Sequence, residues 1–227
     1  HTGLSSDEIE EILYACESHE LKFLYVSPER LKSEAFLERI QDLPISLLAV
    51  DEAHCISQWG YDFRPAYLSI ATIKEYLPNI PTIALTASAT AMVKNDIVEK
   101  LQLNNPKIFF GSFQRENLSY QVAEVHDKIN FLIKLLKQYQ GSSIVYCKSR
   151  KRTKEIADLL QQFHFKADYY HAGLTQEQRN NKQQSWITDK IDTIVCTNAF
   201  GMGIDKPTVR LVVHVDVPDC LENYYQE

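Results

Sequence analysis

The chain has 227 residues, of which 44% are hydrophobic, 24% charged and 11% aromatic, and it contains only 7 glycines and 8 prolines. This composition excludes a disordered, collagen-like or low-complexity chain, and the length allows one large or two modest globular domains. No apolar run approaches the roughly 20 residues of a membrane-spanning helix, and no signal peptide opens the chain. We therefore expect two globular domains and no membrane partner.

The cysteines are odd in number and form no C-x-x-C pair. They are Cys16, Cys55, Cys147, Cys196 and Cys220. This spacing argues against a disulfide framework and against a zinc site, so we expect an intracellular, reducing compartment and no zinc in this chain.

The formal net charge of −6 argues against a protein that simply coats nucleic acid. The charge is unevenly spread, because residues 1–113 carry 9 Lys and Arg against 16 Asp and Glu, whereas residues 114–227 carry 15 against 14. The balance changes within the polar stretch 112–124. We place the domain boundary there, between residues 1–115 and residues 116–227.

The ends of the chain have no obvious start or stop signal. The chain begins on His1 rather than Met, and it ends at Glu227 without a residue that terminates a helix. We expect it to be an internal piece of a longer polypeptide.

Short apolar runs alternate with segments of helical period, which is typical of α/β layers with parallel strands. Helices are predicted after the capping residues Ser5 or Ser6, after Asp127, and from about Lys151. Most strands are apolar on successive positions, as expected for strands covered on both faces. The predicted strands are residues 21–26, 46–50, 82–85, 107–110, 142–147, 167–170, 193–196 and 211–215.

Two adjacent carboxylates, Asp51 and Glu52, follow the apolar run 47–50. The carboxyl edge of a parallel sheet is where such folds bind ligands. Asp51 is placed to hold Mg²⁺ through its water shell and Glu52 to orient an attacking water, as in enzymes that transfer phosphate. The alternative is a strand end with two solvated acids.

Four aromatic residues, one arginine and a glycine follow within residues 55–67. Exposed aromatic rings are platforms for unpaired bases, and Arg64 adds a phosphate or π contact. Alternatively, Trp59, Phe63 and Tyr67 pin the loop to the core. Further along, Ser88 and Thr90 end another strand, where hydroxyls relay hydrogen bonds near a phosphate site or simply cap the next helix.

Five cations stand within residues 148–154, at the start of a predicted helix. Cations there oppose the helix dipole unless an anion is bound, and a phosphate backbone is the natural candidate. A solvated basic face is the alternative.

Two later strand ends carry polar or small residues. His171 follows one strand and is by itself more often structural than catalytic. After the next strand, Thr197 can donate to a phosphate, Gly203 permits close backbone approach to a ligand, and Asp205 can face a nucleotide.

Taken in order, these segments resemble the motor core of superfamily 2 helicases, and residues 51–67 are similar to motif II and the aromatic-rich loop of the RecQ family. Residues 25–31 are similar to motif Ib, 85–90 to motif III, 144–150 to motif IV, 170–174 to the Y-H-A-G-L segment, 199–207 to motif V and 222–227 to the start of motif VI. The resemblance covers nearly the whole chain.

The resemblance implies two RecA-like lobes, the first incomplete at its N-terminus, in an ATP-dependent 3′–5′ DNA helicase that acts in repair and recombination. ATP and Mg²⁺ are its implied cofactors, single-stranded and duplex DNA its partners, and the bacterial cytoplasm or a nucleus its location. Implied catalytic residues are Asp51, Glu52 and His54, with Asp51, Gly203 and Asp205 on the nucleotide. Implied DNA contacts are Trp59, Phe63, Arg64, Ser149, Arg150 and Thr197.

The chain departs from the family pattern in three places. It contains no G-x-x-x-x-G-K-[ST] loop, it stops before the arginines that follow motif VI, and Tyr61 replaces the usual His. We therefore expect this chain alone to be inactive. The competing interpretation is a non-catalytic module that binds DNA or a protein.

Overall fold

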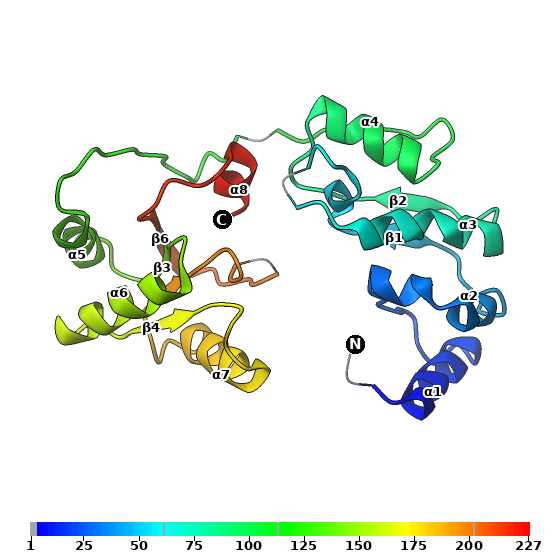
Figure 1. Cartoon of the computed structure of the whole chain (residues 1–227), viewed down its shortest axis with the longest axis horizontal. Coiled ribbons are helices and arrows are strands. Elements are labelled where there is room, and N and C mark those ends of the chain that lie inside the picture. The colour runs from blue at the N-terminus through cyan, green and yellow to red at the C-terminus, as the bar shows by residue number, and fades with distance from the viewer. Residues whose placement is uncertain (1–3, 61, 113, 202) are drawn as a thin grey trace. The chain divides into compact units, whose positions relative to one another are not determined.

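A computed structural model describes residues 4–60, 62–112, 114–201 and 203–227 (Figure 1). The chain divides into two compact units, His1–Gly111 and Ser112–Glu227, and the division falls at the start of the polar stretch 112–124. Each unit combines helices with parallel strands, so the predicted α/β class is confirmed.

The first unit begins with helix α1 (Ser6–Glu17), whose predicted cap is confirmed. The Ser5 side chain accepts a hydrogen bond from the Glu8 backbone N–H, and the Glu8 carboxylate accepts one from the Ser5 backbone N–H, which forms a capping box. The later helices are α2 (Glu34–Ile40), α3 (Ile73–Tyr76) and α4 (Ala91–Lys100). Short 3₁₀ helices span Pro28–Lys32, Ala53–Ile56 and Pro65–Thr72.

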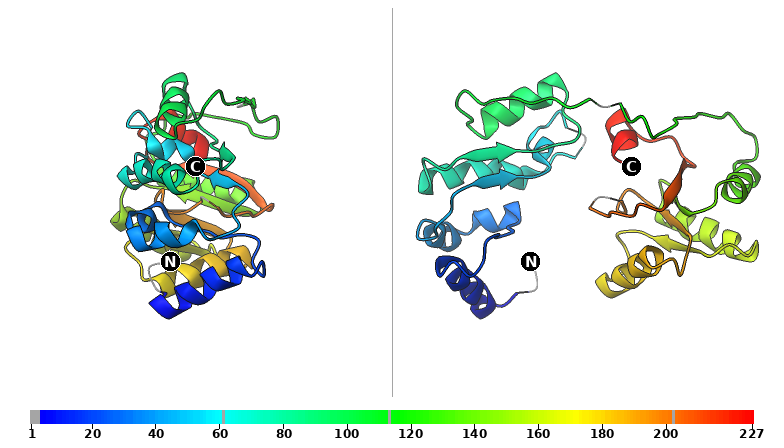
Figure 2. Two further views of the ribbon diagram at one scale, coloured as in Figure 1. Left: turned by 90° about the vertical axis from the view of Figure 1, so that its right-hand side faces the viewer. Right: turned by 180° about the vertical axis from the view of Figure 1, so that it is seen from behind.

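Within the described part of the first unit, strands β1 (Leu48–Val50) and β2 (Thr82–Ala84) pair in parallel, and Figure 2 shows them from behind. The ladder continues past β2, because the Leu85 N–H donates to the Val50 carbonyl at 2.8 Å. One sheet face packs on the core through Val50, which is 4% exposed. On the opposite, apolar face Ile83 is 43% exposed, so the described residues cover this face only in part.

Two predicted strands are absent from the described residues. Residues 21–26 and 107–110 form no strand and pair with none of the described strands. Their aromatic side chains are exposed, as in Tyr25 at 92% and Phe109 at 88%. An apolar run becomes a strand only where a neighbour satisfies its backbone N–H and C=O groups, and here the described residues supply none.

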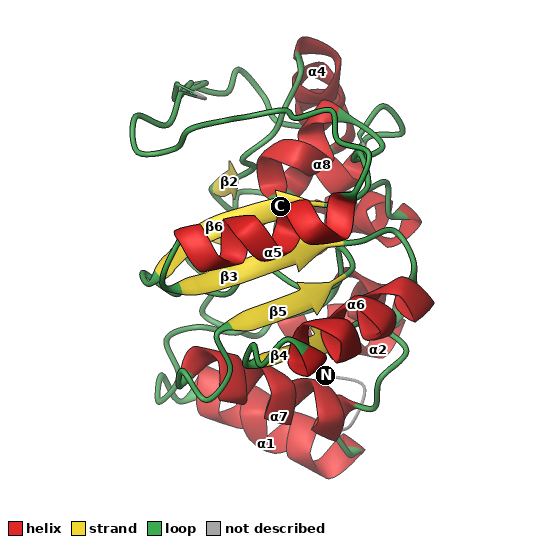
Figure 3. Cartoon of the chain, turned by 90° about the vertical axis from the view of Figure 1, so that its left-hand side faces the viewer, coloured by secondary structure: helices red, strands yellow, loops and turns green. Residues whose placement is uncertain are grey.

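The second unit places α5 (Lys128–Gln138), α6 (Arg150–Gln162) and α7 (Gln176–Ile187) around a sheet (Figure 3). Its described strands are β3 (Ser142–Tyr146), β4 (Ala167–Tyr170), β5 (Thr193–Cys196) and β6 (Val209–His214). All pairs are parallel, in the order β4-β5-β3-β6. The chain then enters α8 (Leu221–Gln226).

Alternation along β3 and β5 sends side chains to two separate cores. Val145 and Val195 pack against α5 and α6 on one face. Ile144 and Ile194 pack against Trp186 of α7 on the other. The sheet is thus covered on both faces, which explains why its strands are apolar at successive positions.

Candidate functional site

The two adjacent carboxylates lie where β1 ends. Asp51 is exposed, and its Oδ1 accepts a hydrogen bond from the Glu52 backbone N–H at 2.8 Å. The Asp51 carbonyl accepts one from the Tyr67 hydroxyl at 3.2 Å. Glu52 adopts the left-handed conformation, with φ of 48°, which turns the chain sharply into the 3₁₀ helix Ala53–Ile56. The turn presents both carboxylates at the sheet edge.

His54 connects this turn to the end of β2. It is 1% exposed, and its Nδ1 lies 3.0 Å from Thr86 Oγ1 and 3.3 Å from Glu52 Oε2. Burial lowers the pKa of His54, so the ring is neutral at physiological pH. Its Nε2 lies 3.7 Å from Cys55 Sγ. One neutral imidazole therefore contacts a carboxylate from the β1 turn and a hydroxyl that follows β2.

The same surroundings make Glu52 a stronger base than a solvated carboxylate. Burial first, and then the nearby negative charge of Asp51, raise the pKa of Glu52. A raised pKa favours taking up a proton, which is what a general base does.

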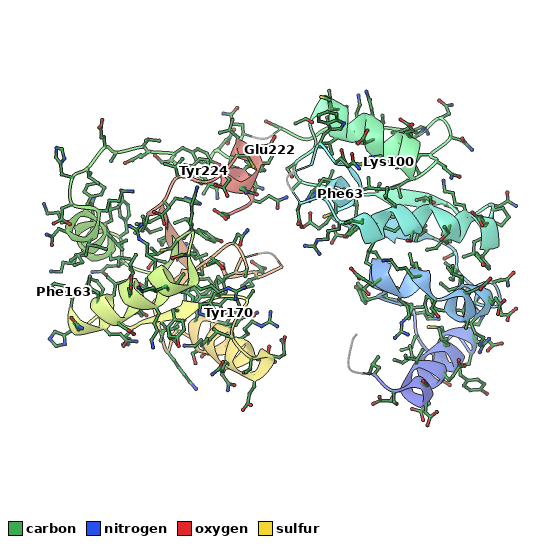
Figure 4. All side chains as sticks on the ribbon, in the orientation of Figure 1. Phe63, Lys100, Phe163, Tyr170, Glu222 and Tyr224 are labelled. Atoms are coloured by element: carbon green, nitrogen blue, oxygen red, sulfur yellow. The ribbon has the colours of Figure 1, made fainter. Side chains whose placement is uncertain are left out.

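The aromatic-rich loop divides into a packed part and an exposed part. Tyr67 is buried, and burial raises the pKa of its hydroxyl to about 12. Trp59 is 68% exposed, whereas Phe63 is half-buried (Figure 4). Arg64 donates to Asp62 Oδ2 from Nε at 3.0 Å and from Nη2 at 2.7 Å. The packing interpretation therefore fits Tyr67, and Trp59 is accessible to a ligand; Tyr61 lies outside the described residues.

Of the two predicted purposes of the hydroxyls after β2, the structure shows the helix cap. The Thr90 side chain accepts from the Val93 N–H and caps α4. Ser88 is buried, and its backbone N–H donates to Thr86 Oγ1 at 3.3 Å. Thr86, which contacts His54, is thus held by the backbone of this segment.

The cations at the start of α6 differ in whether they already pair with a carboxylate. Ser149 caps the helix by accepting from the Arg152 N–H. Lys148 Nζ lies 2.5 Å from Asp219 and Arg152 Nη1 lies 2.8 Å from Asp216, so these two cations are already paired. Arg150 is exposed and lies against Gly173. Among the predicted DNA contacts, Ser149 is occupied by capping and Arg150 is accessible.

The loop after β5 holds the predicted nucleotide residues. Thr197 is half-buried, and its backbone N–H donates to the Tyr170 carbonyl. The Tyr146 hydroxyl donates to the Phe200 carbonyl at 3.0 Å and fixes the loop from below. Gly203 and Asp205 are exposed at the loop tip.

A polar pocket of about 260 Å³ lies at the carboxyl edge of the second sheet. It is lined by Tyr146, Cys147, Lys148, Thr197, Asn198, His214, Asp216, Asp219, Asn223 and Glu227. His214 stacks on Tyr146 with ring centroids 5.1 Å apart, and its Nε2 lies 3.0 Å from Glu227 Oε2. His214 and Asp216 were not predicted as site residues, although both stand where an apolar strand ends, as Asp51 does.

Asp51 suits a hydrated Mg²⁺, because the cation prefers oxygen ligands and keeps several waters. When bound with ATP, Mg²⁺ neutralises phosphate charge. A phosphate-cradling loop of the G-x-x-x-x-G-K-[ST] type is missing from the sequence. Among the described residues no group of three or more His, Cys, Asp or Glu could hold a metal ion by itself, and none of the described helices is long and apolar enough to cross a membrane.

Comparisons with known proteins match both units. The family described as DEAD/DEAH box helicase matches residues 1–97, and the family described as helicase conserved C-terminal domain matches residues 127–227. The helicase Lhr of Mycobacterium smegmatis, solved with single-stranded DNA and AMP-PNP, superimposes over 99% of this chain and 31% of its own, with a TM-score of 0.67 at 18% identity. The two predicted RecA-like lobes are therefore confirmed.

Curated relatives identify the subgroup. The probable ATP-dependent DNA helicase RecS of Bacillus subtilis is 43% identical over 213 residues, which covers 92% of this chain and 43% of RecS. The ATP-dependent DNA helicase RecQ of Pasteurella multocida is 43% identical over 208 residues, covering 91% of this chain and 33% of that protein. The chain thus spans less than half the length of these relatives. With both helicase families matched in order, the chain belongs to the RecQ-type DEAD/DEAH box helicases.

Proposed function

We propose that the protein is an ATP-dependent 3′–5′ DNA helicase that couples ATP hydrolysis to translocation on single-stranded DNA and to duplex unwinding in repair and recombination. The observation that carries the proposal is the group formed by Asp51, Glu52 and His54 at the end of β1, with Thr86 against the imidazole. The relatives, named as ATP-dependent DNA helicases, support DNA as the substrate.

In this proposal the two carboxylates have different roles. The exposed Asp51 binds Mg²⁺ through water, and Glu52, with its raised pKa, takes the proton of the attacking water. His54 contacts Thr86, so a displacement of the β2 end reaches Glu52 through one side chain.

The DNA and nucleotide contacts are those that the family resemblance implies, and the accessibility of Trp59 and Arg150 supports them. Trp59, Phe63 and Arg64 meet single-stranded DNA in the first unit, through stacking and a guanidinium. Ser149, Arg150 and Thr197 meet the backbone in the second unit. Gly203 and Asp205 contact the nucleotide, and the exposed loop tip that carries them supports this assignment.

Because the sequence holds no G-x-x-x-x-G-K-[ST] loop, hydrolysis is to be measured on the protein at its full natural length. We expect ATP hydrolysis that single-stranded DNA stimulates, and the Glu52→Gln variant should lose at least about 100-fold in turnover while retaining DNA binding, because a general base contributes on that order. Steady-state hydrolysis with and without oligonucleotide measures the stimulation by DNA and the loss of turnover.

The matched control is Glu75→Gln on α3, an exposed glutamate in the same unit, which should leave turnover unchanged. Near-normal turnover in Glu52→Gln would remove Glu52 from the base role. DNA binding by the wild type without any hydrolysis would favour the non-catalytic module. Polarity is read from partial duplexes, of which only the one with a 3′ single-stranded tail should be unwound.

A further inference from the structure

Three polar side chains tie the aromatic-rich loop to helix α4. The Ser57 hydroxyl donates to Asp96 Oδ2 at 2.6 Å, and Lys100 Nζ lies 3.0 Å from the same oxygen. Lys100 Nζ also donates to the Ile56 carbonyl at 3.3 Å. Lys100 stands at the end of α4 (Figure 4). Asp96 is thus the centre of a network between the helix and the loop backbone.

Ser57 also restrains the backbone of Trp59. Ser57 is 0% exposed, and while its hydroxyl donates to Asp96, its Oγ accepts from the Trp59 backbone N–H at 3.2 Å. A buried hydroxyl that loses its partner carries a desolvation penalty, so the arrangement is strongly preferred. The backbone of Trp59 is therefore held while its ring stays 68% exposed.

The same segment is continuous with the carboxylate turn. The Ser57 N–H donates to the His54 carbonyl at 3.0 Å, and the Gly60 N–H donates to the Ser57 carbonyl at 3.1 Å. Gly60 lies so close to His54 that an added Cβ would meet its carbonyl oxygen at 2.7 Å. Residues 54–60 thus form one hydrogen-bonded unit that is fixed to α4 at Ser57.

We propose that Asp96 is a positioning residue for polynucleotide binding: through Ser57 it holds the backbone of residues 56–59, so that Trp59 is presented in one place beside the His54 turn. The proposal rests on the assignment of Trp59 to single-stranded DNA under the proposed function. The hydrogen bond from Ser57, followed by Lys100, lowers the pKa of Asp96, so the ionised carboxylate is the form that holds the loop.

The test compares Asp96→Ala and the milder Asp96→Asn, which keeps an acceptor oxygen, with the control Glu99→Ala on an exposed position of the same helix. Hydrogen–deuterium exchange of residues 55–63, measured on the full-length protein without nucleotide, should accelerate about tenfold in Asp96→Ala and less in Asp96→Asn. Affinity for a single-stranded oligothymidylate should fall about five- to tenfold, in line with the loss of one stacked base. Exchange in β3 should not change.

Ser57→Ala provides an independent route should Asp96→Ala fail to fold, and it should reproduce both effects. The double variant should be no weaker than either single one, because the two act through one hydrogen bond. Unchanged exchange, or faster exchange with oligothymidylate affinity intact, would overturn the inference. A wild type that fails to hydrolyse ATP, yet binds oligothymidylate in a manner that depends on Asp96, would overturn the motor function and support the inference.

Discussion

The two units differ in how completely their parallel sheets are paired and covered. In the second unit β3 and β5 are buried along their whole length, with helices on both faces. In the described part of the first unit the sheet has two three-residue strands, and one face leaves Ile83 and Leu85 43% and 48% exposed. Apolar runs of similar composition therefore become either buried strands or exposed segments, depending on which elements pack beside them.

The candidate sites reflect the same difference. In the second unit the predicted site residues follow β3 and β5, which have neighbouring strands on both sides, and the loop after β5 is anchored by the buried Tyr146. In the first unit the site combines short-range contacts among Glu52, His54 and Ser57 with two long-range ones, between His54 and Thr86 and between Ser57 and Asp96. Where the sheet beneath a site is small, contacts from the segment after β2 and from α4 thus add to those of the turn itself.

The largest contrast is expected from truncating one apolar side chain in each unit. Leu160 of α6 is 0% exposed, so Leu160→Ala should lower the free energy of unfolding of the second unit by about 2–5 kcal/mol. Phe23 is 79% exposed, so Phe23→Ala should change that of the first unit by less than about 0.5 kcal/mol. Urea titrations followed by hydrogen exchange in each unit measure the free energy of unfolding of each unit separately.

Core residues of the first unit supply the control, because Ile56→Ala, at a position 0% exposed, should cost as much as Leu160→Ala. A large loss in Phe23→Ala would mean that the Phe23 side chain is covered in solution and that the contrast between the two units is smaller than the described residues indicate.

The fold could be predicted from the sequence where both partners of a strand pair are in the chain. The predicted strands 142–147, 167–170 and 193–196 agree with β3, β4 and β5 to within one residue. The runs 21–26 and 107–110 have the same apolar signal, yet they remain unpaired. Periodicity reports what a side chain prefers to contact, whereas pairing depends on a neighbour that periodicity does not specify.

A second contrast lies between two glycines of the loop after β5. Gly201 has φ of +123°, and an added Cβ would meet the Tyr146 hydroxyl at 2.5 Å, whereas Gly203 has φ of +73° and open space around it. Gly201→Ala should destabilise the second unit by about 2–4 kcal/mol, from strain and overpacking together, and Gly203→Ala by about 1 kcal/mol, from strain alone. Thermal unfolding followed by Trp186 fluorescence ranks them.

Equal losses in the two variants would show that the loop moves away from Tyr146 at little cost. In that case the loop after β5 would be held no more firmly than the turn at Glu52, and the two units would not differ in how their site loops are anchored.

The site itself could be predicted only as far as short motifs extend. Asp51, Glu52 and His54 are adjacent in sequence, so the turn that joins them was predictable, and its contact with Thr86 follows from β1 and β2 being neighbours. The bond from Ser57 to Asp96 spans 39 residues and joins a loop to a helix face. No local spacing encodes such a pair, because it depends on how α4 docks.

The smallest expected effect concerns the stability cost of Glu52. Its pKa is raised above the ordinary value of 4.5, so the folded first unit binds this proton more tightly than the unfolded chain does. The contribution to stability is therefore fully present below pH 4.5 and is lost as the pH rises through the raised value. At neutral pH the ionised carboxylate destabilises the fold, which makes Glu52→Gln the more stable protein.

The gain should stay below about 1 kcal/mol, because the Glu52 side chain is 39% exposed and solvent screens it. Urea unfolding of wild type and Glu52→Gln across pH 4 to 8 measures it, with Glu75→Gln as the exposed control. The gain should shrink toward zero at the acid end. A gain that is independent of pH would mean that the cost lies in the turn at Glu52 rather than in its charge. A loss of stability at neutral pH would mean that the contact between Glu52 and His54 stabilises the turn by more than burial of the charge costs, so that Glu52 itself would stabilise the first site.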